Sequence, residues 1–164
     1  MMDSHSEPAI LPSNKKAGVG MHFTSLSNDY GIGDIGDSAL AFVDRLVSMD
    51  ISCWQFLPTG PTAYGDSAYP PFSAFSGNEN LIGLEPLVRL GLLKTQELEA
   101  ITGFPADHVD YGQLIPKKLV LLTLAAECFS AVASPELKSA YGDFLARHER
   151  HWLNDYAIYR LLKT

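Results

Sequence analysis

Short apolar runs and one helical repeat alternate along the first third of the chain. Residues 17–23 (AGVGMHF) are short and apolar and predict a buried strand, whereas residues 34–50 repeat apolar positions as an amphipathic helix does. Residues 51–57 (ISCWQFL) are apolar and aromatic and predict a second strand, which stops at Pro58. A strand, a helix and a strand in this order form a βαβ unit, which belongs to a parallel sheet or barrel.

The helix expected over residues 34–50 has one apolar face. We expect Asp37 or Ser38 to cap its first turn, because short polar side chains accept hydrogen bonds from the first free amides of a helix. The positions on the apolar face are Leu40, Val43, Leu46 and Val47.

Residues 58–80 show no periodicity and are dense in proline, glycine and serine. A structureless connection of this length in a compact protein is usually functional. The segment also follows the carboxyl end of an expected parallel strand, where ligands bind in open α/β sheets and in barrels. We therefore expect loop 58–80 to carry a binding site.

The second half of the chain predicts helices. Residues 95–101 (TQELEAI) predict a brief helix capped by Thr95. Pro116 is expected to open a strongly apolar helix over residues 116–133, because proline is favoured in the first helical turn.

Ser134 and Pro135 predict the start of a further helix, as an N-cap followed by proline at the first helical position. Aromatic residues recur every three or four positions in its later part and predict a buried helix face. They are Trp152, Tyr156 and Tyr159. The helical pattern continues to the last residue without a C-cap, and two parallel strands do not complete a sheet. We therefore expect these residues to be the front part of a longer protein.

Composition and charge narrow the classes of partner. The chain has 164 residues, of which 46% are hydrophobic, and a net charge of -7. Its 12 basic residues are scattered, so we expect no nucleic-acid partner, since phosphate binding needs clustered Lys and Arg. No apolar stretch approaches the ~18–20 residues that span a bilayer, and the first residues do not resemble a secretory signal. We expect a cytoplasmic protein without membrane contact, in which Cys53 and Cys128 are free thiols.

Three glycines raise the question of a nucleotide site. Gly31, Gly33 and Gly36, in the segment YGIGDIG (30–36), have the spacing of the dinucleotide-binding fingerprint. In that fingerprint the glycines directly follow a strand, and an acidic residue comes about 20 positions later. Here a loop separates the glycines from the first expected strand, and the acidic position falls in the second. We prefer a tight turn that leads into a helix, with a nucleotide-binding fold as a minor alternative.

The side chains of loop 58–80 suit a sugar. Tyr64 and Tyr69 offer flat apolar faces with a polar tip, and sugars present apolar C–H faces surrounded by hydroxyls. The short hydrogen-bonding side chains nearby are Asp66, Ser67, Ser73 and Asn78. The same residues equally fit a structural loop whose tyrosines pack on neighbouring helices. Composition alone leaves both alternatives open.

Four blocks of sequence occur in a recognisable order. They are residues 17–46, residues 54–82 (WQFLPTGPTAYGDSAYPPFSAFSGNENLI), VDYG at 109–112 and HWLNDYAIYRLLK at 151–163. Together they resemble the 4-alpha-glucanotransferases called amylomaltases or disproportionating enzymes (glycoside hydrolase family 77). The resemblance covers residues 17 to 164, and in that family the YGIGDIG turn leads into the first helix and holds no nucleotide.

The resemblance implies an α/β fold, as an incomplete (β/α)8 TIM barrel with its first two strands and a mainly helical inserted region. It implies a disordered leader over residues 1–16, the start of the barrel with loop 58–80 over residues 17–92, and a truncated helical subdomain over residues 93–164. It also implies an enzyme that transfers a segment of an α-1,4-glucan to the 4-hydroxyl of an acceptor sugar, without organic cofactor or metal. Such retaining enzymes use two carboxyl groups about 5–5.5 Å apart, and we expect both beyond residue 164.

The resemblance also implies roles for five substrate-binding residues. Ser67 and Tyr69 match residues that line the sugar subsite next to the cleaved bond. Tyr64 and Tyr111 match aromatics of a second, more remote glucan site, and Asp66 matches a motif residue that we expect to cap the loop.

The chain departs from the family pattern inside the loop. Ala68 stands where proline is common, and Glu79 and Asn80 stand where the family commonly has proline and tyrosine. We expect these changes to loosen the loop. They leave as the leading hypothesis the amino-terminal part of a 4-alpha-glucanotransferase, with a non-catalytic α-glucan-binding module or inactive fragment as the alternative.

Two further pairs have simpler explanations. His148 and His151 stand three residues apart on an expected helix, which we attribute to a solvated surface rather than to a metal site. Phe72 and Phe75 are expected to pack into a core beneath the loop.

Overall fold

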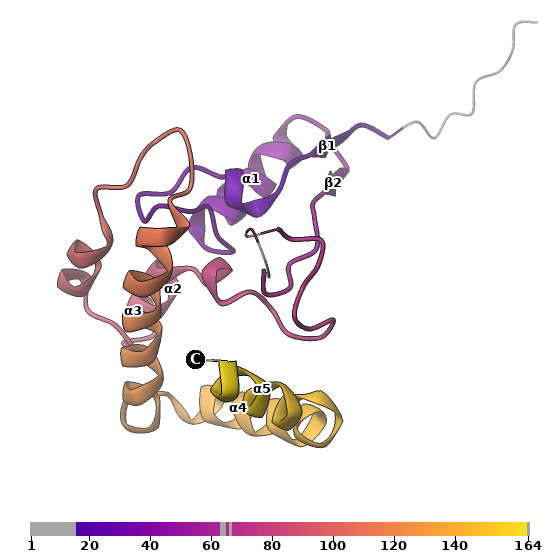
Figure 1. Ribbon diagram of the computed structural model, residues 1–164. Coiled ribbons are helices and arrows are strands. Elements are labelled where there is room, and N and C mark those ends of the chain that lie inside the picture. Colours follow the sequence, from indigo (N-terminus) through magenta and orange to yellow (C-terminus); the bar gives the residue numbers. More distant parts are fainter. Residues whose placement is uncertain (1–15, 63–64, 66, 164) are drawn as a thin grey trace, which may run out of the picture.

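The computed structural model describes residues 16–62, 65 and 67–163 of the chain (Figure 1). The leader expected over residues 1–16 therefore lies outside the described residues, apart from Lys16.

A parallel βαβ unit opens the fold. Strand β1 (Gly18–Gly20) pairs in parallel with strand β2 (Cys53–Gln55), so that Val19 lies opposite Trp54. Helix α1 (Asp37–Ser48) connects the two strands, as the hydrophobic pattern predicts. Both strands are shorter than expected, and after β1 the chain soon turns into a 3-10 helix (η1, Phe23–Ser25).

Aromatic side chains fill the space beside this small sheet. The rings of Phe23 and Trp54 lie 4.7 Å apart between centroids, and Phe42 of α1 lies 4.9 Å from Trp54. The indole Nε1 of Trp54 donates a hydrogen bond to the carbonyl of Met21 at 2.7 Å, so the half-buried ring has its polar atom satisfied. A first core cluster forms here from the buried residues Phe23, Leu26, Ala39 and Leu81.

Helix α1 buries a different stripe from the predicted one. It packs through Ala39 and Leu46, whereas Leu40, Val43 and Val47 are exposed. The prediction of its apolar face is therefore wrong at three of its four positions. The buried stripe lies next to the predicted one around the helix, and periodicity alone does not distinguish two adjacent apolar stripes.

The expected caps of α1 are also wrong. Gly36 occupies the N-cap position, with no side-chain cap. The Asp37 carboxylate accepts two hydrogen bonds from Arg89, at 2.6 and 2.7 Å, and Ser38 Oγ donates to the carbonyl of Ser27 at 2.6 Å. Both polar side chains thus fasten α1 to other segments.

Helices and connecting loops make up the rest of the described chain. Beyond η3 (Glu79–Leu81) the elements are α2 (Leu84–Arg89), η4 (Thr95–Ile101), α3 (Tyr111–Val132), α4 (Pro135–His148), the π-helical turn η5 (Glu149–Leu153) and α5 (Asn154–Lys163). Figure 1 shows loop 58–80, in magenta, between the βαβ unit and the α4–α5 pair. A second core cluster joins the glycine turn to α2, η4 and α3; its buried members are Ile32, Leu84, Leu92, Leu93, Leu98, Ile101, Leu114, Leu121 and Ala125.

The predicted helix starts were right at one place and wrong at two. Ser134 caps α4, with Oγ accepting from the Leu137 amide at 3.2 Å. Helix α3 begins five residues before Pro116, because the Asp110 carboxylate caps it by accepting from the Gln113 amide at 3.1 Å. The N-cap of η4 is Lys94, whose amide donates to the Glu97 carboxylate at 2.8 Å. The prediction that Thr95 caps this helix is therefore wrong.

Among the described residues, no single helix is both long and apolar enough to span a membrane. Helix α3 and the run Pro135–Lys163 pass that test of length and composition together, but they are bent by 114° at their junction.

A buried ion pair fixes α3 to the glycine turn and to the end of loop 58–80. The side chains of Lys118 and Asp34 are fully buried, at 0% exposure. Lys118 Nζ donates to the carbonyl oxygen of Asn80 at 2.7 Å and lies 3.8 Å from Asp34 Oδ2, which also accepts from Asn28 Nδ2 at 3.1 Å. Burial lowers the pKa of Lys118 to about 8, against the attraction of Asp34, and burial raises the pKa of Asp34.

We expect Lys118→Met to lower the free energy of unfolding by about 3–5 kcal/mol, because it leaves Asp34 buried without a cationic partner. Urea unfolding followed by circular dichroism measures this loss. Lys138→Met, at an exposed position of α4, is the matched control and should change stability by less than about 0.5 kcal/mol. A Lys118→Met variant as stable as the control would contradict the structural role of the pair.

Lys118 also gives stability a pH dependence with a defined sign. Its pKa is about 8 in the folded chain against an ordinary value of 10.5, so between these values the unfolded chain binds more protons. The free energy of unfolding that this group contributes is lowest below pH 8 and rises as the pH increases toward 10.5. The difference in stability between the wild type and Lys118→Met should therefore grow with pH in urea titrations at about pH 7.5, 9 and 10. A constant or shrinking difference would be incompatible with the lowered pKa.

Candidate functional site

The glycine turn is tightly packed and offers no phosphate cradle. A Cβ atom at Gly33 would overlap the carbonyl oxygen of Phe23, and Gly31 has a φ of +84° with the ring of Phe104 against its Cα. The Cα atom of Gly83 would lie 3.2 Å from a Cβ at Gly36. The three glycines thus allow segments to approach closely, which agrees with the preferred sequence interpretation.

A cleft of about 590 Å³ lies beside this turn, between residues 24–33 and residues 103–109. Its lining includes the carboxylates Asp29 and Asp107 and the imidazole of His108. His108 Nδ1 lies 2.8 Å from Asp107 Oδ1, and this contact lowers the pKa of the Asp107 carboxyl. Two carboxylates in the lining disfavour a phosphate group here.

Loop 58–80 doubles back on itself at a narrow neck. The amide of Asn78 donates to the carbonyl of Thr59 at 2.8 Å, and the amide of Phe72 donates to the carbonyl of Pro61 at 3.2 Å. Pro61 is itself among the fully buried side chains. The base of the segment has a defined conformation, and the described residues 62, 65 and 67–71 belong to a tip beyond the neck.

The tip presents Tyr69 to solvent. The Tyr69 side chain is 72% exposed, and its amide lies 3.3 Å from Ser67 Oγ, which accepts the hydrogen bond. These two predicted site residues are therefore neighbours on one turn, and most of the Tyr69 side chain is exposed to solvent. Of the other predicted residues, Tyr64 and Asp66 lie outside the described residues.

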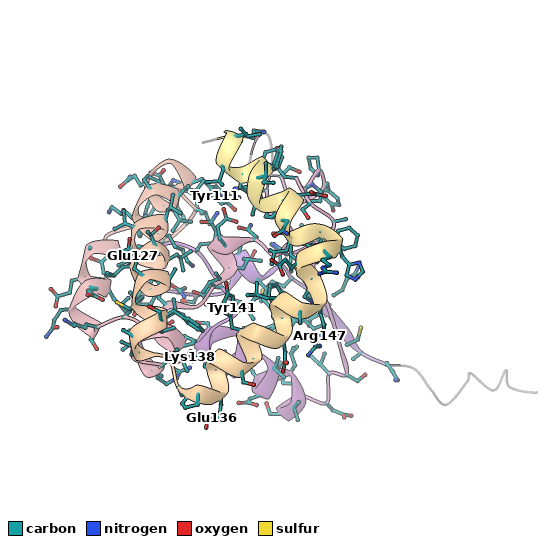
Figure 2. The ribbon with its side chains drawn as sticks, turned by 90° about the horizontal axis from the view of Figure 1, so that it is seen from below. Tyr111, Glu127, Glu136, Lys138, Tyr141 and Arg147 are labelled. Carbon is teal, nitrogen blue, oxygen red and sulfur yellow. The ribbon has the colours of Figure 1, made fainter. Side chains whose placement is uncertain are left out.

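Tyr111 comes from a different element. It is the first residue of α3, and its partly buried ring packs against the second core cluster (Figure 2). The structure therefore places Tyr111 at the start of a helix, whereas Ser67 and Tyr69 belong to the loop tip.

Loop 58–80 contacts η5 and α5 through charged and aromatic side chains. Arg160 Nη2 lies 2.6 Å from Glu79 Oε1, and the Lys163 ammonium lies 3.9 Å from the centroid of the Phe72 ring. Phe75 stacks on Trp152 of η5 with centroids 6.2 Å apart. Phe72 and Phe75 are 38% and 72% exposed, so the expectation that they pack into a core is wrong.

The aromatic stripe of the last helices, formed by Trp152, Tyr156 and Tyr159, takes part in these contacts. Trp152 and Tyr156 are half-buried and Tyr159 is 37% exposed, so the stripe is not the buried face that the sequence predicts. It faces loop 58–80, because the rings of Tyr159 and Phe72 lie 5.9 Å apart. Trp152 Nε1 also donates to His148 Nδ1 at 3.1 Å. No group of three side chains suited to metal binding occurs in the part of the chain that is described.

A pocket of about 300 Å³ lies where the loop, α3 and α5 meet. Its walls include the aromatic rings of Phe72 and Tyr159, and its polar groups include Asn78, Glu79 and Arg160. Aromatic faces thus lie beside polar groups in this pocket, where Glu79 and Arg160 pair at 2.6 Å.

Sequence reasoning missed Lys118, Arg160 and Lys163. One signal existed for Lys118, which occupies a position in an otherwise apolar helical repeat. No signal existed for the other two, because their partners Glu79 and Phe72 are distant in sequence.

Comparison with known proteins identifies the family. Residues 21–164 match the family model described as 4-alpha-glucanotransferase. The chain belongs to this family. The resemblance read from the four sequence blocks is thereby confirmed.

Relatives agree along nearly the whole chain. The 4-alpha-glucanotransferase of Thermus thermophilus is 43% identical over 146 residues, which cover 89% of this chain and 28% of that protein. A 4-alpha-glucanotransferase of Streptococcus pneumoniae is 41% identical over 152 residues, covering 91% of this chain and 29% of the relative. The chain thus spans less than a third of the length of these 4-alpha-glucanotransferases.

A solved structure shows the same fold. The amylomaltase from Streptococcus agalactiae in complex with acarbose is 38% identical to this chain and superimposes with a TM-score of 0.81. The superposition covers 91% of this chain and 30% of the amylomaltase. The two-stranded parallel sheet and its helices therefore correspond to a part of the amylomaltase fold.

We expect Gly33→Ala to destabilise the chain by about 1–3 kcal/mol, because the added methyl group has no room beside the Phe23 carbonyl. Thermal and urea unfolding measure the loss. Gly20→Ala is the matched control, since a Cβ there meets nothing within 4 Å.

In the same thermal assay, NAD or ATP should leave the melting temperature of the wild-type chain unchanged. A clear shift would support the nucleotide-binding alternative.

Proposed function

We propose that this chain supplies the amino-terminal part of the glucan-binding surface of a 4-alpha-glucanotransferase. The observation that carries the proposal is the solvent-facing Tyr69 at the tip of a loop with a fixed neck, directly after β2. Family membership and the structural similarity to an amylomaltase in complex with acarbose support it. Under this proposal β1 and β2 are the first two strands of a (β/α)8 barrel over residues 17–92, and residues 93–164 form a helical subdomain.

The tip residues fit the binding of one sugar unit. The exposed Tyr69 ring offers an apolar plate for the C–H face of a glucose ring, and Ser67 offers a hydroxyl beside it. We propose that these two residues line the sugar subsite next to the cleaved bond. We further propose that Tyr64 and Tyr111 contact a more remote part of an α-1,4-glucan and that Asp66 supports the loop.

The chemistry assigned to the whole protein is retaining transfer. One carboxylate forms a covalent glycosyl intermediate, while a second carboxyl group acts first as acid and then as base. We propose that both belong to residues beyond 164, so the contribution of this chain is to bind and orient the glucan. Orientation matters for transfer, because an acceptor hydroxyl must reach the intermediate in place of water.

A non-catalytic glucan-binding module is the second candidate, and the same exposed loop favours it. The two candidates differ in turnover. A protein that contains this chain and both carboxylates should release glucose from maltotriose, whereas a binding module should not. We expect the protein to act in the cytoplasm, with α-glucan rather than nucleic acid or membrane as its partner.

We expect Tyr69→Ala to weaken maltoheptaose binding to the chain by about tenfold, because removing an exposed aromatic plate costs about 1–1.5 kcal/mol of contact. Isothermal titration calorimetry measures the affinity. Tyr69→Phe keeps the ring and should retain most of it. The control Tyr141→Ala removes another exposed tyrosine, on α4, and should leave the affinity unchanged (Figure 2). Wild-type chain that does not bind maltoheptaose would refute the proposed function.

A further inference from the structure

We propose that Arg160 and Lys163 of α5 are positioning residues for the glucan loop. They hold the neck of loop 58–80 and so set the direction in which its tip, with Ser67 and Tyr69, faces the substrate. The inference rests on the proposed glucan-binding function and adds to it a residue set on a different element.

Arg160 contacts one side of the neck, at Glu79. Its guanidinium lies 2.6 Å from the Glu79 carboxylate, and its Nη1 also donates to the Tyr156 hydroxyl at 3.3 Å. Two partners at different angles fix the orientation of the planar guanidinium group. Glu79 directly follows Asn78, the residue whose amide bonds to Thr59 across the neck.

Lys163 grips the other side. Its ammonium lies 3.9 Å from the centroid of the Phe72 ring, and it donates to the Tyr159 hydroxyl at 3.2 Å. Phe72 is 38% exposed, so core burial does not hold it in place. The Phe72 amide makes the second hydrogen bond across the neck, to Pro61. Both hydrogen bonds of the neck are therefore next to, or part of, a residue held by α5.

This segment is held from inside at Asn80, whose carbonyl accepts the 2.7 Å hydrogen bond from Lys118 Nζ, so α5 adds the outer restraint at Glu79. Residues 76–80 contain no proline, so no fixed φ angle limits their backbone. The Glu79 and Arg160 side chains are 32% and 40% exposed, which makes their attraction moderate and sensitive to salt. A moderate restraint fits a positioning role, because its loss displaces the tip without unfolding the core.

Amide hydrogen exchange tests the restraint in the absence of any glucan. In Arg160→Met and Lys163→Met, the amides of Phe72 and Asn78 should exchange about two- to fivefold faster, while helical amides of α3 stay unchanged. Arg150→Met and Lys138→Met each remove an exposed cation of the same helical run and should leave the exchange of the Phe72, Asn78 and α3 amides at wild-type rates. Unchanged exchange at both neck amides would overturn the proposal.

Calorimetric titration with maltoheptaose tests the consequence for binding. Each single variant should weaken the affinity about two- to fivefold, and Glu79→Arg combined with Arg160→Glu should restore it by re-forming the pair in reverse. A purely structural role would lower the melting temperature without changing the affinity of the folded chain, and that result would overturn the proposal. If wild-type chain binds while all variants bind equally well, only this inference falls. If wild-type chain does not bind, the proposed function falls and this inference falls with it.

Discussion

The burial of one lysine against one aspartate is the constraint on which the other contacts depend. Lys118 and Asp34 lie out of reach of water, so their charges need partners within the protein. The groups that meet this need include the Asn80 carbonyl, the facing carboxylate and the Asn28 amide. Helix α3, the glycine turn and the end of loop 58–80 must therefore meet at one point, whatever else the loop does.

This anchor gives the loop a firm base and leaves its tip adjustable. The end of the loop at Asn80 is held from inside by a buried hydrogen bond of 2.7 Å, and the neck is braced from outside by α5 through partly exposed groups. Buried charged contacts are costly to break, whereas exposed ones contribute little each. Tyr69 extends beyond both supports. Under the proposed function, this fixed base pre-orients Tyr69 for its ligand, which lowers the entropic cost of binding.

The local parts of the fold could be predicted from sequence, and the parts set by distant partners could not. The βαβ order and the Ser134 cap follow from apolar runs and from an N-cap that acts within three residues. The predicted start of α3 was wrong because Pro116 suggested a first turn, whereas Asp110 caps the helix further upstream. For the site, composition and motif indicated Ser67 and Tyr69. The contacts that hold the loop could not be predicted, because a salt bridge between distant residues such as Arg160 and Glu79 produces no periodic pattern in either segment.

The exposed apolar residues of helix α1 favour the proposed barrel. Its apolar residues form two stripes, since Ala39 and Leu46 are buried while Leu40, Val43 and Val47 are exposed. A contiguous exposed apolar stripe marks a surface that another element covers. In a (β/α)8 barrel every helix packs both on its strands and on its neighbours in the outer ring, so it needs two apolar stripes. An α1 with two such stripes has the pattern that this position in a barrel requires, and a helix on a free-standing two-stranded sheet would need only one.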